Sequence, residues 1–283
     1  MKSLKQRNLD YTCTVISLYP YSFSLLLLQV ILAGDICGLL PHVRSDIARE
    51  LGLDCSLPLR MLNYPAYANQ DPRFTTTIRK SYRSNVQLMS VSSTLLHDGM
   101  VTFNSAFEKH NSPLPALQFV PVDGAMELRT KNGRSSYVNM AEVRAVVQQV
   151  QNFYSVGLKP EEVGVFSSAV RQLYVIKDEL DKDKIALPMI GHVDDFIGEE
   201  VTALIISCVQ SYPEGGKKSD EAIGFIGHPE LSSFAISRAR RFLTVVGNLK
   251  CLHREDLFWR FFLDAADREG HLDFEKVLKA GDS

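Results

Sequence analysis

The chain has 283 residues, of which 45% are hydrophobic and 23% are charged, and its formal net charge is −2 at pH 7. This length allows one large or two small domains with a substantial buried core. The near-neutral charge excludes an overall basic field for nucleic acid, so any such surface has to be local. The five cysteines lack C-x-x-C spacing, which argues against a zinc site or a disulfide framework and favours a reducing compartment.

The first residues are the least typical part of the chain. No charged residue occurs from Tyr11 to Gly34, and Leu25–Leu28 is a run of leucine. A signal peptide or a membrane anchor is one interpretation of this pattern. Pro20 and Gln29 interrupt the apolar run, so we favour an N-terminal extension over residues 1–28 that does not pack into the core.

Apolar runs predict the strands of an α/β fold. A buried strand is expected at Val30–Ala33, and two helical pieces, SDIARELGL and SLPLRML, follow it. Phe74–Ile78 is a further candidate strand. The strands expected in one parallel sheet are Leu117–Val120, Val163–Phe166, Leu204–Ser207 and Phe242–Val246.

The helices between these strands have core-facing apolar spacing. The segment from Asn139 to Tyr154 carries valines at helical intervals, and Asn139 with Glu142 three residues later has the pattern of a capping box. Further helices are expected at Ala169–Leu180 and Leu257–Ala266.

A basic segment joins a helix to the last strand. In SFAISRARRFLTVVGN, which ends at Asn248, we place Arg238, Arg240 and Arg241 in the last turn of the helix, where cations suit the helix dipole. A guanidinium held there at a sheet edge could meet a phosphate. The alternative is a surface helix with solvated arginines.

Three other segments combine residue types suited to a nucleotide. They are QVILAGDICGLLP (Gln29–Pro41), SYRSN (Ser81–Asn85) and GHVDDFIGEEVTALIISCVQS (residues 191–211). In the second, Tyr82 offers a flat face and Arg83 a forked donor. Taken alone, a Tyr-Arg pair is a weak signal.

In chain order these segments resemble the third to sixth motifs of superfamily-one RNA helicases, and most nearly those of the Armitage-type helicases of small-RNA silencing. The resemblance covers about Gln29–Trp259. It implies an α/β fold with a RecA-like parallel sheet and helices on both faces. The implied domains are an extension at 1–28, a remnant of the first RecA-like domain at 29–70 and the second RecA-like domain at 71–283.

The resemblance also implies roles for individual residues. Arg238 and Arg83 reach phosphate and are the expected catalytic residues, and Glu200 lies at the ribose. From the motif positions we expect Arg83, Glu200 and Arg238 to converge on one edge of the sheet, near the carboxyl ends of its strands. The implied nucleotide-binding set is Gly34, Asp35, Tyr82, Arg83, Gly198, Glu200 and Arg238. The implied RNA-binding set is Ser167, Val193 and Asp194. The cofactor of the full-length family is ATP with Mg²⁺, and we expect no metal site within this chain.

Several positions depart from the family pattern. Gly38 and Ile197 stand where the family has Gln, and Gln210 stands where it has Arg. The sequence contains no G-x-x-x-x-G-K-[ST] phosphate loop and no D-E-A-x-Q stretch. Half a site should contribute little to phosphoryl transfer. We therefore expect the isolated chain to bind nucleotide and RNA weakly and not to hydrolyse ATP.

Two classes of function follow. The first is the C-terminal part of an ATP-dependent RNA helicase of the silencing branch, and the second is a non-catalytic RNA- or protein-binding module derived from such a helicase. The implied partners are single-stranded RNA and silencing ribonucleoprotein components, with no readable preference for DNA and no membrane. The implied location is the cytoplasm, including ribonucleoprotein granules.

Overall fold

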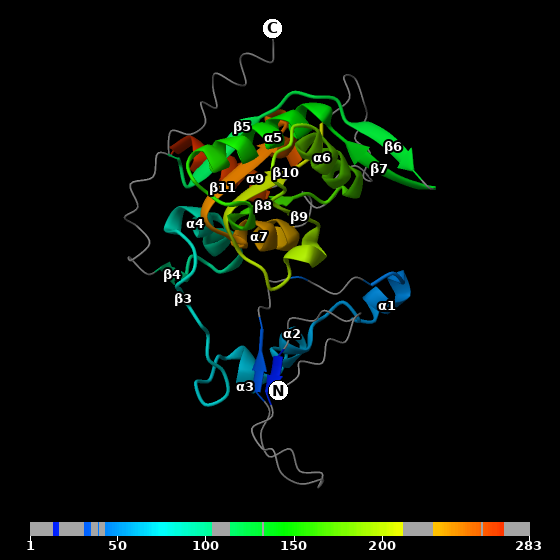
Figure 1. Cartoon of the computed structure of the whole chain (residues 1–283). Helices are drawn as coiled ribbons and strands as arrows, with labels where there is room; N and C mark the ends of the chain where they lie inside the picture. Colours follow the sequence, from blue (N-terminus) through cyan, green and yellow to red (C-terminus); the bar gives the residue numbers. More distant parts are fainter. Residues whose placement is uncertain are drawn as a thin grey trace, which may run out of the picture. The chain divides into compact units, whose positions relative to one another are not determined.

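The computed structural model of the chain describes residues 14–16, 31–34, 39, 43–103, 114–131, 133–211, 229–255 and 257–268. The chain forms two compact units, Met1–Ile78 and Arg79–Ser283. Figure 1 shows the first unit in blue to cyan and the sheet-containing second unit in cyan through green to red. The division expected from sequence, at residues 28 and 70, stays a prediction.

The first unit is built from short elements. Strands β1 (Thr14–Ile16) and β2 (Ile31–Ala33) pair antiparallel. Helices α1 (Asp46–Glu50), α2 (Leu57–Met61) and α3 (Pro65–Ala68) follow. The two helical pieces expected before residue 71 are therefore confirmed as α1 and α2, each of which begins at a serine whose hydroxyl accepts a backbone N–H.

Two expectations for this unit need correction. The strand expected at Val30–Ala33 is present as β2 but is not buried, since Ile31 is 41% exposed and β2 pairs with a single described strand, β1. Within residues 1–28, where no strand was expected, Thr14–Ile16 forms β1, and the rest of that range lies outside the described residues. In the described part of the chain, no helix is both long and apolar enough to cross a membrane.

The second unit contains a five-stranded sheet of order β5-β11-β10-β8-β9. Its strands are β5 (Leu117–Pro121), β8 (Val163–Phe166), β9 (Met189–Gly191), β10 (Val201–Ser207) and β11 (Ala239–Gly247). Every neighbouring pair is parallel. The four strands expected in one parallel sheet are thus confirmed, and β9 is a fifth strand at the edge beside β8.

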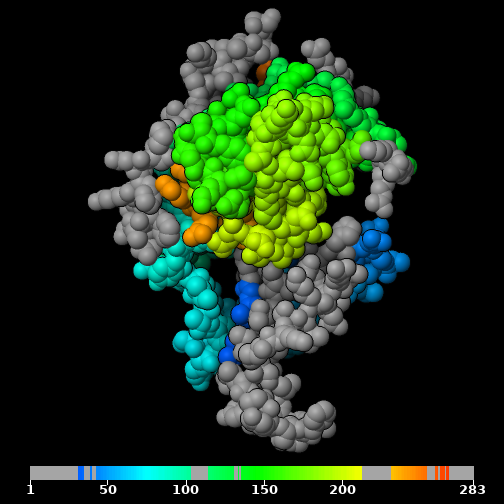
Figure 2. Space-filling model, in the orientation of Figure 1, coloured from blue at the N-terminus to red at the C-terminus, as the bar shows by residue number. Residues whose placement is uncertain are grey.

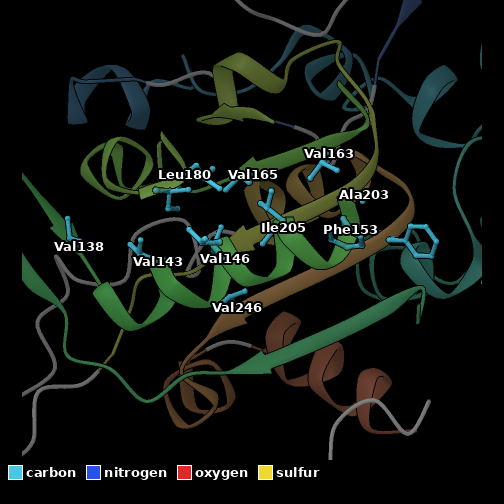
Figure 3. Packing of buried hydrophobic residues seen from close by; sticks show 14 residues of the cluster. Val138, Val143, Val146, Phe153, Val163, Val165, Leu180, Ala203, Ile205 and Val246 are labelled. Atoms are coloured by element: carbon cyan, nitrogen blue, oxygen red, sulfur yellow. The ribbon is translucent and has the colours of Figure 1, made fainter. Parts of the chain in front are cut away.

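Alternation along the central strands supplies both faces of the sheet with apolar side chains. Ala203 and Ile205 of β10 belong to a buried cluster with residues of helices α5 (Met140–Ser155) and α6 (Val170–Lys182). Figure 3 shows this cluster, with side chains of α5 directed at the strands. Leu204 and Ile206, which alternate with them, are also fully buried.

Helices cover both faces of the sheet for this reason. Helices α5 and α6 lie side by side on the face turned to the viewer in Figure 2. The second unit also has α4 (Val86–Leu96), α7 (Pro229–Ser237) and α9 (Leu257–Arg268), each of which contacts β5 or β11. Helix α8 (Leu249–Glu255) follows β11 directly. The α/β architecture expected from sequence is confirmed.

Smaller elements differ from expectation. Phe74–Ile78 is not a strand, and the nearest strand is the two-residue β3 (Lys80–Ser81), which pairs parallel with β4 (Thr102–Phe103). A hairpin that the sequence analysis missed, formed by β6 (Glu127–Lys131) and β7 (Arg134–Val138), precedes α5. The short 3-10 helices η2 and η3 span Pro160–Glu162 and Val193–Phe196.

Candidate functional site

An arginine cluster forms where the loop before α4 meets the starts of β10 and β11. Arg83 donates from Nη1 to Glu200 Oε1 at 2.9 Å and from Nη2 to the carbonyl of Ser237 at 2.8 Å. The neighbouring Ser84 donates its hydroxyl to the carbonyl of Ala239 at 3.0 Å. These bonds hold the loop before α4 against the beginnings of two central strands. Arg83 and Glu200 are 117 residues apart in the sequence.

Arg238 lies in the turn between α7 and β11 and is held on several sides. Its Nε and Nη2 donate to Ser237 Oγ at 3.2 and 3.0 Å, and its Nη1 donates to the carbonyl of Glu199 at 3.5 Å. The guanidinium carbon is 4.5 Å from the ring centroid of Phe234. Cation–π contact and hydrogen bonds therefore fix its direction.

The cluster has more positive than negative charge. Burial, and then the charge of Arg83, lower the pKa of Arg238 to about 10, while Glu200 raises it. Arg240 Nε is 3.9 Å from Glu200 Oε2. In the ion pairs of the described residues, two of these arginines, Arg83 and Arg240, share the single carboxylate of Glu200. A phosphate would supply the missing negative charge.

An aromatic ring stands next to this cluster in sequence. Tyr82 is 61% exposed, and Lys80 Nζ is 5.2 Å from its ring centroid. A flat exposed ring with a nearby ammonium is suited to a base with its phosphates.

The structure brings Arg83, Glu200 and Arg238 together, but not at the end of the sheet that the sequence suggested. We expected them near the carboxyl ends of the strands. Glu200 directly precedes β10 and Arg238 directly precedes β11, so the cluster lies at the amino ends of these parallel strands. The expected position was wrong because both residues come before their strands.

The helix expected to carry three arginines in its last turn is shorter than predicted. Helix α7 ends at Ser237, and Arg240 and Arg241 belong to β11. The reason is that the carbonyl of Arg238 already accepts the N–H of Val201, which draws the chain into the sheet.

The remaining residues of the expected nucleotide set are placed as follows. Gly198 has a φ of +81°, a left-handed conformation that favours glycine, and is exposed in the turn after η3. Gly34 is exposed in the first unit. Asp35 lies outside the described residues.

The expected RNA-binding residues lie at the opposite end of the sheet. Ser167 directly follows β8, and Val193 and Asp194 lie in η3, just after β9. Asp194 is exposed, whereas Ser167 is fully buried and its Oγ accepts the N–H of Ala169 at 3.3 Å. Val193 is also buried. The role of these residues in RNA binding stays a prediction, and only Asp194 presents an exposed side chain for it.

Sequence reasoning missed a buried polar network at the carboxyl end of β10. Glu142 on α5 accepts hydrogen bonds from Ser207 Oγ at 2.7 Å and from the Val209 N–H at 2.8 Å. Gln172 on α6 donates from Nε2 to Ser207 Oγ at 2.9 Å and accepts the Asn139 N–H at Oε1, 3.0 Å away. The network ties α5, α6 and β10 together.

This network replaces the expected capping box. Asn139 does cap α5, because its Oδ1 accepts the N–H groups of Ala141 and Glu142. Glu142, however, points into the sheet rather than back to the Asn139 N–H, which Gln172 takes instead. Burial raises the pKa of Glu142 to about 8, against the hydrogen bonds from Ser207 and the backbone.

The described residues contain no group of three or more His, Cys, Asp or Glu placed to hold a metal ion. Of the side chains described above, the arginines gathered at the amino ends of β10 and β11 are those suited to a phosphate.

The chain is similar in sequence to several known proteins. A family model described as "AAA domain" matches residues 61–250. The "5'-3' DNA helicase ZGRF1" of Mus musculus is 29% identical over 254 residues, which cover 86% of this chain and 13% of that protein. The "Putative helicase MOV-10" of Gallus gallus is 32% identical over 275 residues, covering 86% of this chain and 28% of that protein.

A third relative, the "RNA helicase Mov10l1" of Mus musculus, is 26% identical over 254 residues, with 81% of this chain and 21% of that protein covered. The chain therefore spans between 13% and 28% of the length of these relatives. The relatives include one protein named as a DNA helicase and others named as RNA helicases.

Proposed function

The chain belongs to the AAA domain family and is related to superfamily-one helicases, and we propose that it acts as the second RecA-like half of an ATP-dependent helicase. Its arginine cluster contacts the nucleotide phosphates, and the opposite end of its sheet contacts the nucleic acid. Magnesium ligands and the phosphate loop come from the first RecA-like half.

The arrangement of Arg83, Arg238 and Arg240 around Glu200 carries this proposal. Arg238 is partly buried among other cations, and burial together with Arg83 lowers its pKa. Such a guanidinium is held ready for an anion instead of being neutralised by its surroundings. An arginine directed at a transferring phosphoryl group contributes about 10³–10⁵ in rate when the phosphate is already held.

RNA is the nucleic acid that we propose, and small-RNA silencing in the cytoplasm or in ribonucleoprotein granules is the process. Relatives named as RNA helicases support this choice, although one relative is named as a DNA helicase. The narrower resemblance to Armitage-type helicases supports the silencing branch, and a protein named "Probable RNA helicase armi" of Drosophila melanogaster is 25% identical over 260 residues.

A second candidate function is a binding module that has kept the fold and lost the chemistry. The residues Gly38, Ile197 and Gln210 favour it, because they replace two glutamines and one arginine of the family pattern. This module would bind RNA or a protein without turning over ATP.

Binding and turnover of ATP by the purified chain test the proposal. We expect weak binding of ATP that Arg238→Ala reduces further, and no ATP turnover with or without RNA. Arg241→Ala is the matched control, because Arg241 lies on β11 with its guanidinium carbon 5.1 Å from the Phe242 ring and has no described contact with Glu200.

Two results would contradict the proposal in different ways. RNA-stimulated turnover that is lost in Arg238→Ala would show that the chain is an enzyme by itself. Equal ATP binding by Arg238→Ala, Arg241→Ala and the unmodified chain would remove the arginine cluster from the nucleotide site and favour the binding module.

A further inference from the structure

Val209, two residues after β10, has an unusual backbone conformation. Its φ is +68°, in the left-handed region that β-branched residues rarely adopt, and its side chain is 2% exposed. Such conformations persist only where the surroundings hold them, and they occur often at functional sites. A specific contact should therefore hold Val209.

That contact comes from α5. The N–H of Val209 donates to Glu142 Oε2 at 2.8 Å, and the same oxygen accepts the Ser207 hydroxyl at 2.7 Å. The Ser207 hydroxyl can serve as the donor because Gln172 Nε2 donates to it at 2.9 Å. One carboxyl oxygen thus accepts from the last residue of β10 and from the second residue after it.

At the start of its own helix, Glu142 makes one side-chain contact, since its Oε1 accepts from Asn139 Nδ2 at 3.4 Å, and its Oε2 accepts from Ser207 and Val209. The hydrogen bond that a capping glutamate would make goes to Gln172, as the Asn139 N–H donates to Gln172 Oε1 at 3.0 Å. Glu142 is fully buried, and an unpaired polar group there would be costly. Its partners at Ser207 and Val209 are therefore the reason for a carboxyl group at this position.

We propose that Glu142 is a positioning residue that keeps Val209 in the left-handed conformation and so directs residues 209–211 at the carboxyl end of β10. Gln210 and Ser211 are 8% and 6% exposed, and Ser211 Oγ makes no hydrogen bond within the described residues. The importance of this positioning role rests on the proposed function, in which nucleic acid contacts the carboxyl end of the sheet.

Three substitutions in the full chain separate this role from simple packing. Glu142→Met removes the accepting oxygen at a similar side-chain volume, whereas Glu142→Gln keeps one oxygen that can accept from Val209. Val209→Gly removes the need for support, because glycine adopts a positive φ readily. The double variant Glu142→Met with Val209→Gly tests whether the effect passes through the backbone at residue 209.

The first measurement is amide hydrogen exchange followed by NMR. We expect Glu142→Met to speed exchange of the Val209 amide by up to about tenfold, the range expected for one lost hydrogen bond between neutral groups. Ile205 in the middle of β10 should exchange as before, and Glu142→Gln should keep the Val209 amide protected. Unchanged exchange of Val209 in Glu142→Met would overturn the proposal.

The second measurement is binding of a labelled single-stranded oligouridine, detected by photocrosslinking. Glu142→Met should weaken crosslinking, and Val209→Gly in the same chain should restore it. Failure of the glycine to restore crosslinking would overturn the positioning role. If the unmodified chain does not crosslink at all, the nucleic-acid part of the proposed function fails, and the amide exchange still decides the role of Glu142.

If Glu142→Met does not fold, the double variant and Glu142→Gln replace it. Recovery of a folded chain by Val209→Gly supports the proposal, because glycine at residue 209 cannot repair a packing defect at residue 142. An unfolded double variant would contradict it.

Discussion

The pH dependence of stability should reveal the buried carboxyl group of Glu142. Burial raises its pKa from the ordinary value of 4.5 to about 8. A group whose pKa is raised by folding stabilises the fold fully below the pKa of the unfolded chain, and that contribution is lost as the pH rises through the folded pKa. The free energy of unfolding should therefore fall between about pH 4.5 and pH 8.

The size of the effect follows from the two pKa values. Each pH unit in this window costs about 1.4 kcal/mol, so the whole window costs about 5 kcal/mol. Two neighbouring thiols titrate at higher pH, since burial raises the pKa of Cys251 to about 11 and that of Cys208 well above its ordinary value. Within this network, Glu142 is therefore the group that titrates between about pH 4.5 and pH 8.

Glu142→Gln is the variant that measures the effect. Its amide is neutral at every pH and keeps an oxygen for Ser207 and Val209. Urea unfolding at several pH values, with the unmodified chain and the variant side by side, gives the difference in free energy of unfolding. We expect the unmodified chain to lose up to about 5 kcal/mol relative to the variant as the pH rises to about 8. Parallel pH profiles for the two proteins would refute the reasoning.

Other substitutions have equally direct expectations in urea unfolding. Gly124→Ala should cost about 1–3 kcal/mol, because its Cβ would lie 2.5 Å from Asn139 Oδ1 and 2.6 Å from Ala141 Cβ; an unchanged midpoint would contradict this. Leu204→Ala should cost about 2–5 kcal/mol, because Leu204 is fully buried, and a smaller loss would mean that the site collapses. Glu200→Gln should cost about 1 kcal/mol or less, because its ion pairs are partly exposed, and the loss should shrink at high salt.

The sheet was predictable from sequence because its strands are apolar runs of suitable length. Leu204–Ser207 lies within a longer apolar run, and Phe242–Val246 is bounded by Arg241 and Gly247. Both segments are buried on both faces, which gives a strong signal. The three-residue β9 is too short to produce such a signal. The β6–β7 hairpin does have a sequence signal, which is the Asn-Gly dipeptide before β7. Gly133 of this dipeptide has a φ of +72°.

The meeting of Arg83, Glu200 and Arg238 was predictable, but their position on the sheet was not. The motif pattern pointed to Arg83, Glu200 and Arg238, and their hydrogen bonds and charges meet in the structure. The pattern does not say at which end of a strand a residue lies, and that depends on where β10 and β11 begin.

Glu142 shows why the buried network could not be predicted. In sequence it occupies the third position of α5 after the cap, where a capping box is the ordinary expectation. Its partner Ser207 is 65 residues away, and Gln172, which displaces it from the cap, is 33 residues from Asn139. Only the packing of α5 and α6 on β10 decides which of the two side chains takes the Asn139 N–H.

Strand β10 links the two ends of the proposed site. Glu200 precedes it and the Ser207–Val209 segment ends it, and its seven residues span about 20 Å. All but Thr202 are buried, and β10 pairs with β8 and β11 along most of its length. The close packing and the pairing on both sides of residues 203–206 make this part of the strand resist bending. On the proposed function, a shift of Glu200 and the arginines on phosphate binding would therefore reach the nucleic-acid end as a movement of the whole sheet, and Glu142 would carry the same movement into α5.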